Sequence, residues 1–315
     1  MSQTFETFIR FTTDSVGLER TFRLFQSIVQ ILSFFSIPFD FLLYVLSAST
    51  GQIPSSSTTR AILLALNQRL GLARRFFRLF RSLDSLNSAQ KLSSRLTSPE
   101  TWAGPTRGLL AKAVPWLDVF GKTFMGLYLL LEAVTLPNAL QIANLSPLSA
   151  SQERLITTEA QRFWLFSLIC GALYHICEIP LLIAYFPPPK MESVLDTDKT
   201  KEDIQERLDA EKMSEEEHAE YLKRAEEKRE KVTREWAKQV SGLVWKLGRA
   251  ATANALDVVL PGVTVGWIKA EPGTVGVAML VTTVLTSMDV WERCGREVRG
   301  VKAADGGSWA IPRRT

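Results

Sequence analysis

The chain has 315 residues, of which 46% are hydrophobic and 22% are charged, and its formal net charge at pH 7 is +4. Its three cysteines and two histidines argue against a disulfide framework and leave little for a metal site. The charge is unevenly distributed, because residues 190–235 carry a net charge of −5 and the remaining, more apolar residues carry +9. A basic and apolar remainder favours an anionic lipid surface over a soluble acidic ligand.

The amino-terminal part predicts paired helices without a secretory signal, because no basic segment is followed by an apolar one. Apolar residues between Phe5 and Phe35 recur every three or four positions, with an interruption at residues 13–17. This spacing predicts two helices with a break between them. Residues 28–46 are strongly apolar, but Pro38 and Asp40 divide them, which favours a buried helix pair over a membrane span.

Residues 60–84 follow a Ser/Thr-rich loop and predict one amphipathic helix with two contrasting faces. Its polar face has four arginines: Arg74, Arg75, Arg78 and Arg81. Its apolar face includes three phenylalanines: Phe76, Phe77 and Phe80. A cationic face opposite bulky apolar side chains is typical of a helix that lies in a membrane surface. The same pattern also fits an ordinary helix whose phenylalanines pack into the protein, and a nucleic-acid or calmodulin-type target is less favoured.

The middle of the chain contains two long apolar stretches. Residues 116–136 predict a buried or interfacial helix, because three charges interrupt them. Residues 163–186 have the length of a membrane span, but His175, Glu178 and Pro180 lie near their centre, so a span and a buried helix both remain open. Residues 190–246 then predict a charged linker followed by a long solvated helix, which either joins two membrane-associated parts or binds a partner.

Residues 247–300 are apolar and glycine-rich, with a break at residues 269–273, and predict a helical hairpin embedded in a membrane. The second half has 16 uncharged residues after the break, which is short for an independent span. Arg293, Arg296 and Arg299 follow it and favour a cytosolic carboxyl terminus. The chain is thus expected to divide into a helical region (1–189), a charged segment (190–246), the hairpin (247–300) and a tail (301–315).

Three stretches in this order resemble the peroxin eleven proteins, a family that elongates and proliferates peroxisomes. The first resembles an amino-terminal family motif and the last a carboxyl-terminal one, while residues 72–81 are similar to the family's basic amphipathic segment. The residues that match the two terminal motifs are Thr13, Asp14, Gly17, Arg20, Arg23 and Gln26, and then Asp257, Pro261, Gly273, Gly276 and Trp291. The chain departs from the pattern by inserting Ser15 and Val16, and Phe80 stands where a glycine is common.

The resemblance implies an all-α, membrane-associated helical bundle with amphipathic helices and one or two apolar membrane-embedded helices or hairpins. It implies a peroxisomal membrane protein, without enzymatic activity, whose basic helix inserts into the cytosolic leaflet, bends the membrane and so promotes proliferation and fission. The expected lipid-binding residues are the seven in the 74–81 segment: Arg74, Arg75, Phe76, Phe77, Arg78, Phe80 and Arg81.

Expected partners are an anionic phospholipid membrane, further copies of this chain or related proteins in an oligomer, and fission machinery, with no nucleic acid. Two other functions remain open. A channel or metabolite-passing protein would use His175 and Glu178, and an adaptor would use the charged helix to recruit fission machinery. No common nucleotide-binding, hydrolase or metalloprotease motif occurs in the chain, so we expect neither an enzyme nor a cofactor or metal.

Overall fold

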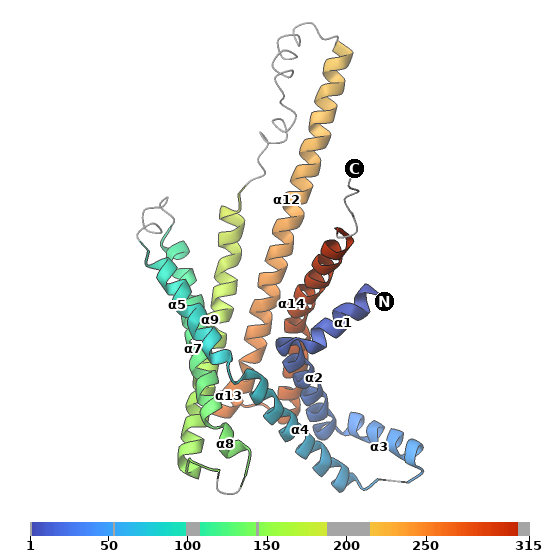
Figure 1. The fold of residues 1–315 in the computed structure, drawn as a ribbon, viewed down its shortest axis with the longest axis vertical. Coiled ribbons are helices and arrows are strands. Elements are labelled where there is room, and N and C mark those ends of the chain that lie inside the picture. Colours follow the sequence, from blue (N-terminus) through green and yellow to red (C-terminus); the bar gives the residue numbers. More distant parts are fainter. Residues whose placement is uncertain (1, 53, 99–107, 143–144, 188–214, 308–315) are drawn as a thin grey trace, which may run out of the picture. The chain divides into compact units, whose positions relative to one another are not determined.

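A computed structural model describes residues 2–52, 54–98, 108–142, 145–187 and 215–307 (Figure 1). Its elements in these ranges are helices, with no strand, so the all-α fold class is confirmed. Their bounds are α1 (Gln3–Thr13), α2 (Ser15–Phe34), α3 (Ser36–Thr50), α4 (Ser56–Arg78), α5 (Arg81–Leu96), α7 (Leu109–Val134), α8 (Leu136–Ala139), α9 (Ala150–Tyr185), α12 (Glu215–Asp257), α13 (Val259–Val265) and α14 (Pro272–Gly307).

The chain divides into two compact units, one formed by residues 1–175 with 249–315 and the other by residues 176–248. In the smaller unit the indole of Trp236 on α12 donates a hydrogen bond of 2.8 Å to the carbonyl of Pro187 and packs against Phe186. On α12, Glu230 and Arg234 form an ion pair at 2.7 Å. Residues 190–214 of the expected charged segment and residues 308–315 of the expected tail lie outside the described residues.

The larger unit is organised around α2, which packs against α4 on one side and α14 on another. Buried Val29, Phe39 and Leu63 form a core cluster that joins α2, α3 and α4. A second cluster joins α7 to α9, where Tyr128 stacks on Trp164 with ring centroids 5.2 Å apart. The bundle therefore has two apolar cores, and α2 contributes to the first.

The predicted break between α1 and α2 is confirmed, and two residues of the amino-terminal motif produce it. The carboxylate of Asp14 accepts hydrogen bonds of 3.0 Å from the backbone amides of Val16 and Gly17, which caps α2. A Cβ at Gly17 would lie 2.0 Å from the carbonyl oxygen of Phe11. The end of α1 therefore approaches α2 so closely that only glycine fits at this position.

Among the described residues, two helices are long and apolar enough to cross a membrane: α9, and residues 272–300 of α14. The pair α2 and α3, bent by 98° at Phe35, qualifies as a third candidate if it forms one span. The sequence-based expectation for the stretch after Gly273 needs correction, because α14 does not end with its 16 uncharged residues. It continues as one helix past Asp289, and this length makes it a span candidate.

Candidate functional site

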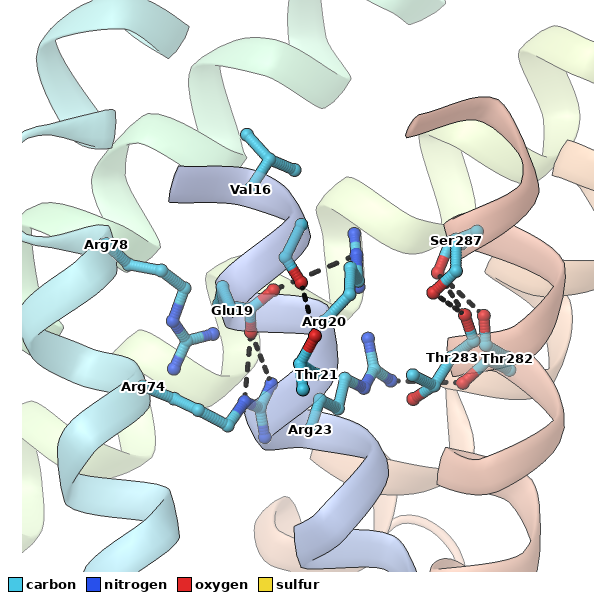
Figure 2. A network of polar contacts seen from close by, with 12 residues as sticks. Val16, Glu19, Arg20, Thr21, Arg23, Arg74, Arg78, Thr282, Thr283 and Ser287 are labelled. Atoms are coloured by element: carbon cyan, nitrogen blue, oxygen red, sulfur yellow. Dashed lines mark hydrogen bonds and ion pairs between the residues drawn. The ribbon is translucent and has the colours of Figure 1, made fainter. Parts of the chain in front are cut away.

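The predicted amphipathic helix is two helices in the structure. Its arginines point into the bundle and much of its apolar face is exposed, which is the reverse of an ordinary amphipathic helix on a protein surface. α4 ends at Arg78 and α5 begins at Arg81, with Phe80 at the junction. The arginine-bearing face of α4 points toward α2, as Figure 2 shows for Arg74 and Arg78 beside Glu19. Much of the apolar face is exposed instead. The orientation is set by the partners that the arginines find in the bundle.

Arg74 is buried, with 8% of its surface exposed. Its Nε and Nη2 atoms each lie 2.9 Å from Oε1 of Glu19 on α2, and Nη1 donates to the side-chain oxygen of Gln26 at 2.6 Å. Burial lowers the pKa of Arg74 to about 10, against the opposing effect of Glu19, so the side chain stays cationic at neutral pH. Arg74 thus joins α4 to α2 through a buried ion pair.

Arg78 makes the matching connection to α7. Its guanidinium donates to Oε1 of Glu132 at 2.8 Å and to the hydroxyl of Tyr128 at 3.2 Å, and that hydroxyl donates to Glu132 at 3.1 Å. Burial by itself would lower the pKa of Arg78, but Tyr128 and Glu132 raise it above its ordinary value. Burial raises the pKa of Tyr128 to about 12, so its phenol remains neutral and able to donate.

The other two arginines are less enclosed. Arg75 has its Nε 3.7 Å from Glu132, a longer contact than that of Arg78, and its side chain is half-buried. Arg81 lies at the start of α5 and makes no ion pair with any of the described residues. These two cations are the members of the predicted set that remain near the surface.

The three phenylalanines also differ in burial. Phe77 points inward and packs against Phe22 of α2, with ring centroids 5.3 Å apart. Phe76 is 48% exposed and Phe80 is 75% exposed. Further exposed apolar side chains along α4 and the start of α5 are Ile62, Leu64, Leu66 and Leu83. We use the name apolar face of α4 for five of these side chains, which continue past the end of the helix: Ile62, Leu66 and Phe76 on α4, Phe80 at the junction, and Leu83 at the start of α5.

A second buried ion pair links α2 to the carboxyl-terminal part of the unit. Nη2 of Arg23 lies 2.5 Å from Oδ1 of Asp257 and donates to the hydroxyl of Thr282 on α14 at 3.0 Å. Figure 2 shows Arg23 reaching from α2 toward α14, on the opposite side from Arg74. The three stretches that carry the family resemblance therefore meet at α2.

The other motif residues explain why these helices approach so closely. A Cβ at Gly273 would lie 2.3 Å from a ring carbon of Phe34, and Gly276 faces Gln30 and Ile31. At the far end of the pair, Trp291 packs against Phe11 of α1 with ring centroids 5.8 Å apart. α2 and α14 are thus antiparallel, and glycines at the start of α14 set their spacing.

Sequence reasoning missed the acidic partners, Glu19 and Glu132. They lie 55 and 54 positions from Arg74 and Arg78 along the chain, and no local pattern connects them. The one available signal was the position of Glu19 inside the amino-terminal motif, next to Arg20. No group of three or more potential metal ligands occurs in the part of the chain that the structure describes.

Comparison with known proteins gives one result. The family model of peroxisomal biogenesis factor 11 (PEX11) matches residues 5–291. The match covers all three stretches that carry the resemblance, together with the helices between them. No curated protein and no solved structure gives a significant match to the chain.

Proposed function

The chain belongs to the peroxisomal biogenesis factor 11 family, and we propose that it elongates the peroxisomal membrane by inserting the apolar face of α4 into the cytosolic leaflet. Membership makes it a peroxisomal membrane protein involved in peroxisome proliferation. The family is one of biogenesis factors and not a known enzyme family. The mechanism proposed here concerns how the membrane is deformed.

The observation that carries the proposal is the exposure of the apolar face of α4 while the opposite face is held by buried ion pairs. Phe76 and Phe80 are exposed, and Arg74 and Arg78 on the other side contact Glu19 and Glu132. Several exposed apolar side chains on one side of a helix favour contact with a membrane or another protein. Moving one such side chain from water into lipid contributes about 1.5–3 kcal/mol.

The ion pairs fix α4 to the bundle, so its apolar face keeps one orientation. We call this face, when inserted into lipid, the wedge. A helix that is free on both faces can rotate until its arginines meet the headgroups, but Arg74 and Arg78 are engaged inside the bundle. We infer that Arg75 and Arg81 contact the headgroups instead, each contributing about 1 kcal/mol near an anionic leaflet. Volume added to one leaflet alone expands that leaflet, which favours curvature.

The proposal requires α4 to face the cytosol, and the charges at the end of α14 support this orientation. Arg293, Arg296 and Arg299 follow the apolar part of the candidate span, and basic residues next to a span favour the cytosolic side. Protease treatment of intact peroxisomes carrying a carboxyl-terminal tag tests it. Loss of the tag supports a cytosolic carboxyl terminus, and protection of the tag contradicts it.

The wedge itself is tested with the full chain reconstituted into liposomes that contain anionic phospholipid. The wild type is expected to convert spherical vesicles into tubules visible by electron microscopy. The double substitution Phe76→Ser and Phe80→Ser should abolish tubules while circular dichroism and thermal unfolding stay close to the wild type, because both side chains are exposed.

A matched control removes two exposed apolar side chains elsewhere, by Ile142→Ser and Leu145→Ser between α8 and α9. This control should tubulate like the wild type. If the Phe76 and Phe80 variant also tubulates normally, the wedge is not the deforming element. If the control loses tubulation to the same extent, the effect does not belong to α4.

A further inference from the structure

Two adjoining pockets lie where α1 and α2 meet α14, away from α4. The first has a volume of about 360 Å³ and apolar walls that include Phe11, Leu24 and Met288. The second has a volume of about 390 Å³ and polar walls. Trp291 and Glu292 line both pockets, so the two lie side by side, and together we call them the cavity, with an apolar part and a polar part.

The polar part has a net positive charge, because two arginines outnumber its one acidic residue, Glu292, whose carboxylate lies 3.7 Å from Arg249. Arg296 and Arg299 line it and stand one helical turn apart on α14, both with exposed side chains. Neither makes an ion pair with a described residue, whereas Arg293 contacts Asp14 at 2.7 Å. Two adjacent guanidinium groups without an ion-pair partner among the described residues suit a phosphate, which they bind with paired hydrogen bonds.

A third arginine lines the apolar part. The Nε atom of Arg20 is buried and has no hydrogen-bond partner among the described residues, and its guanidinium lies 3.7 Å from Glu19. Figure 2 shows Arg20 on the side of α2 that faces α14, away from Arg74. Arg20 therefore adds a third positive charge to the wall of the cavity, although Glu19 offsets part of it.

We propose that this cavity binds one phospholipid with an anionic headgroup, with an acyl chain in the apolar part and the phosphate at Arg296 and Arg299. The volumes lie within the range of about 300–1,000 Å³ that ligand pockets occupy. The cavity flanks the end of the candidate span of α14, where Trp291 stands at the position of an interfacial tryptophan. The occupant is inferred from the charge of the polar part, since an uncharged or zwitterionic amphiphile brings no net negative charge to offset the two arginines.

This site is independent of the wedge, because it is built from α1, α2 and α14 and includes no residue of the apolar face of α4. Lipid binding here holds α1 against α14 and fixes the depth of the bundle in the membrane. A chain that fails to tubulate vesicles can still bind this lipid, so the two proposals fail separately.

The test uses the full chain in nanodiscs of phosphatidylcholine that contain a trace of phosphatidic acid with a photoreactive group on one acyl chain. After illumination, mass spectrometry locates the labelled residues. We expect label concentrated on residues that line the apolar part, such as Leu24, Val284 and Met288. A phosphatidylcholine probe with the same acyl chain should label them much less.

Two variants probe the two parts of the cavity. Arg296→Gln with Arg299→Gln removes the phosphate site from the surface and should lower labelling on the order of tenfold. Val284→Trp fills the apolar part and should remove the label there. The control for charge is Arg154→Gln with Lys269→Gln, which removes two exposed cations outside the cavity and should label like the wild type.

The proposal is overturned if label spreads evenly along α14, or if the phosphatidylcholine probe labels the cavity as strongly as phosphatidic acid. It is equally overturned if the Arg296 and Arg299 variant behaves like its charge control. Competition with a free fatty acid distinguishes the source of the anion. Displacement of the probe by the fatty acid at equal concentration contradicts a phospholipid site, and its failure to displace supports one.

Discussion

Arg23 and Asp257 lie 234 positions apart in the chain, and their side chains are in contact inside the larger unit at 2.5 Å. Both side chains are more than nine-tenths buried, so neither has water as an alternative partner. Thr282 accepts a second hydrogen bond from Arg23. The pair therefore connects the amino-terminal motif to the carboxyl-terminal motif across the interior of the bundle.

Arg23→Gln is expected to destabilise the protein by about 3–5 kcal/mol, because it leaves the Asp257 carboxylate buried without its cation. Guanidinium or thermal unfolding of the full chain in detergent measures this. Arg10→Gln is the control, since Arg10 and Glu297 form an exposed pair at 2.8 Å, and such pairs contribute about 0–1 kcal/mol. Equal effects of the two substitutions would contradict a structural role for the buried pair.

Gly17→Ala is expected to detach α1 from α2, because the added Cβ would lie 2.0 Å from the backbone carbonyl of Phe11. Faster amide hydrogen exchange over residues 3–13 reports this detachment. The matched control is Gly242→Ala, where a Cβ meets no atom within 4 Å in the interior of α12. That control should gain helix stability of up to about 1 kcal/mol. If Gly17→Ala leaves the amide exchange of residues 3–13 unchanged, the close approach of α1 and α2 does not require glycine at this position.

Tyr128→Phe is expected to cost about 1–3 kcal/mol near neutral pH, because Arg78 and Glu132 lose a buried hydroxyl partner. Burial raises the folded-state pKa of Tyr128 from 10.0 to about 12. Stability that depends on the neutral phenol is therefore fully present below pH 10 and is lost as the pH rises toward 12. The difference between wild type and variant should shrink over that interval in unfolding measurements, while Tyr44→Phe, at an exposed site, should behave like the wild type.

Substitutions at Arg74 and Arg81 should have different effects, the first on stability and the second on membrane binding. Arg74→Gln leaves buried Glu19 with only the more distant Arg20 as a cation and is expected to lower the unfolding free energy by up to about 3–5 kcal/mol. Arg81→Gln should leave stability within about 0.5 kcal/mol and weaken sedimentation with anionic liposomes about fivefold, as expected for one surface arginine near such a leaflet. The reverse pattern would place the headgroup contact at Arg74.

Helical periodicity was sufficient to predict much of the fold. The break between α1 and α2 follows from Asp14 and Gly17, which act within a few residues of their own positions. The division of residues 28–46 occurs at Phe35, close to Pro38, so that stretch also follows from local sequence. The continuity of α14 past its charged residues was missed, because a count of uncharged positions does not show where a helix ends.

The orientation of α4 could not be predicted from its own residues. A helical wheel separates an arginine face from an apolar face, but it does not show which of them meets the protein. That choice depends on Glu19 and Glu132, whose side chains come from α2 and α7. Because each buried arginine requires a buried acid, the acidic residues on other helices decide which face of α4 meets the protein. Local periodicity does not reveal these contacts.

The position of α2 at the centre of the larger unit has a consequence for biosynthesis. α2 leaves the ribosome well before the partners of its Arg23 side chain, Asp257 and Thr282, which are translated more than 230 residues later. Until then, the Arg23 side chain, which is buried in the folded unit, lacks these two partners in the nascent chain. The unit therefore closes only after α14 has been made, so a cell must keep an incompletely folded intermediate from aggregating before it reaches its organelle.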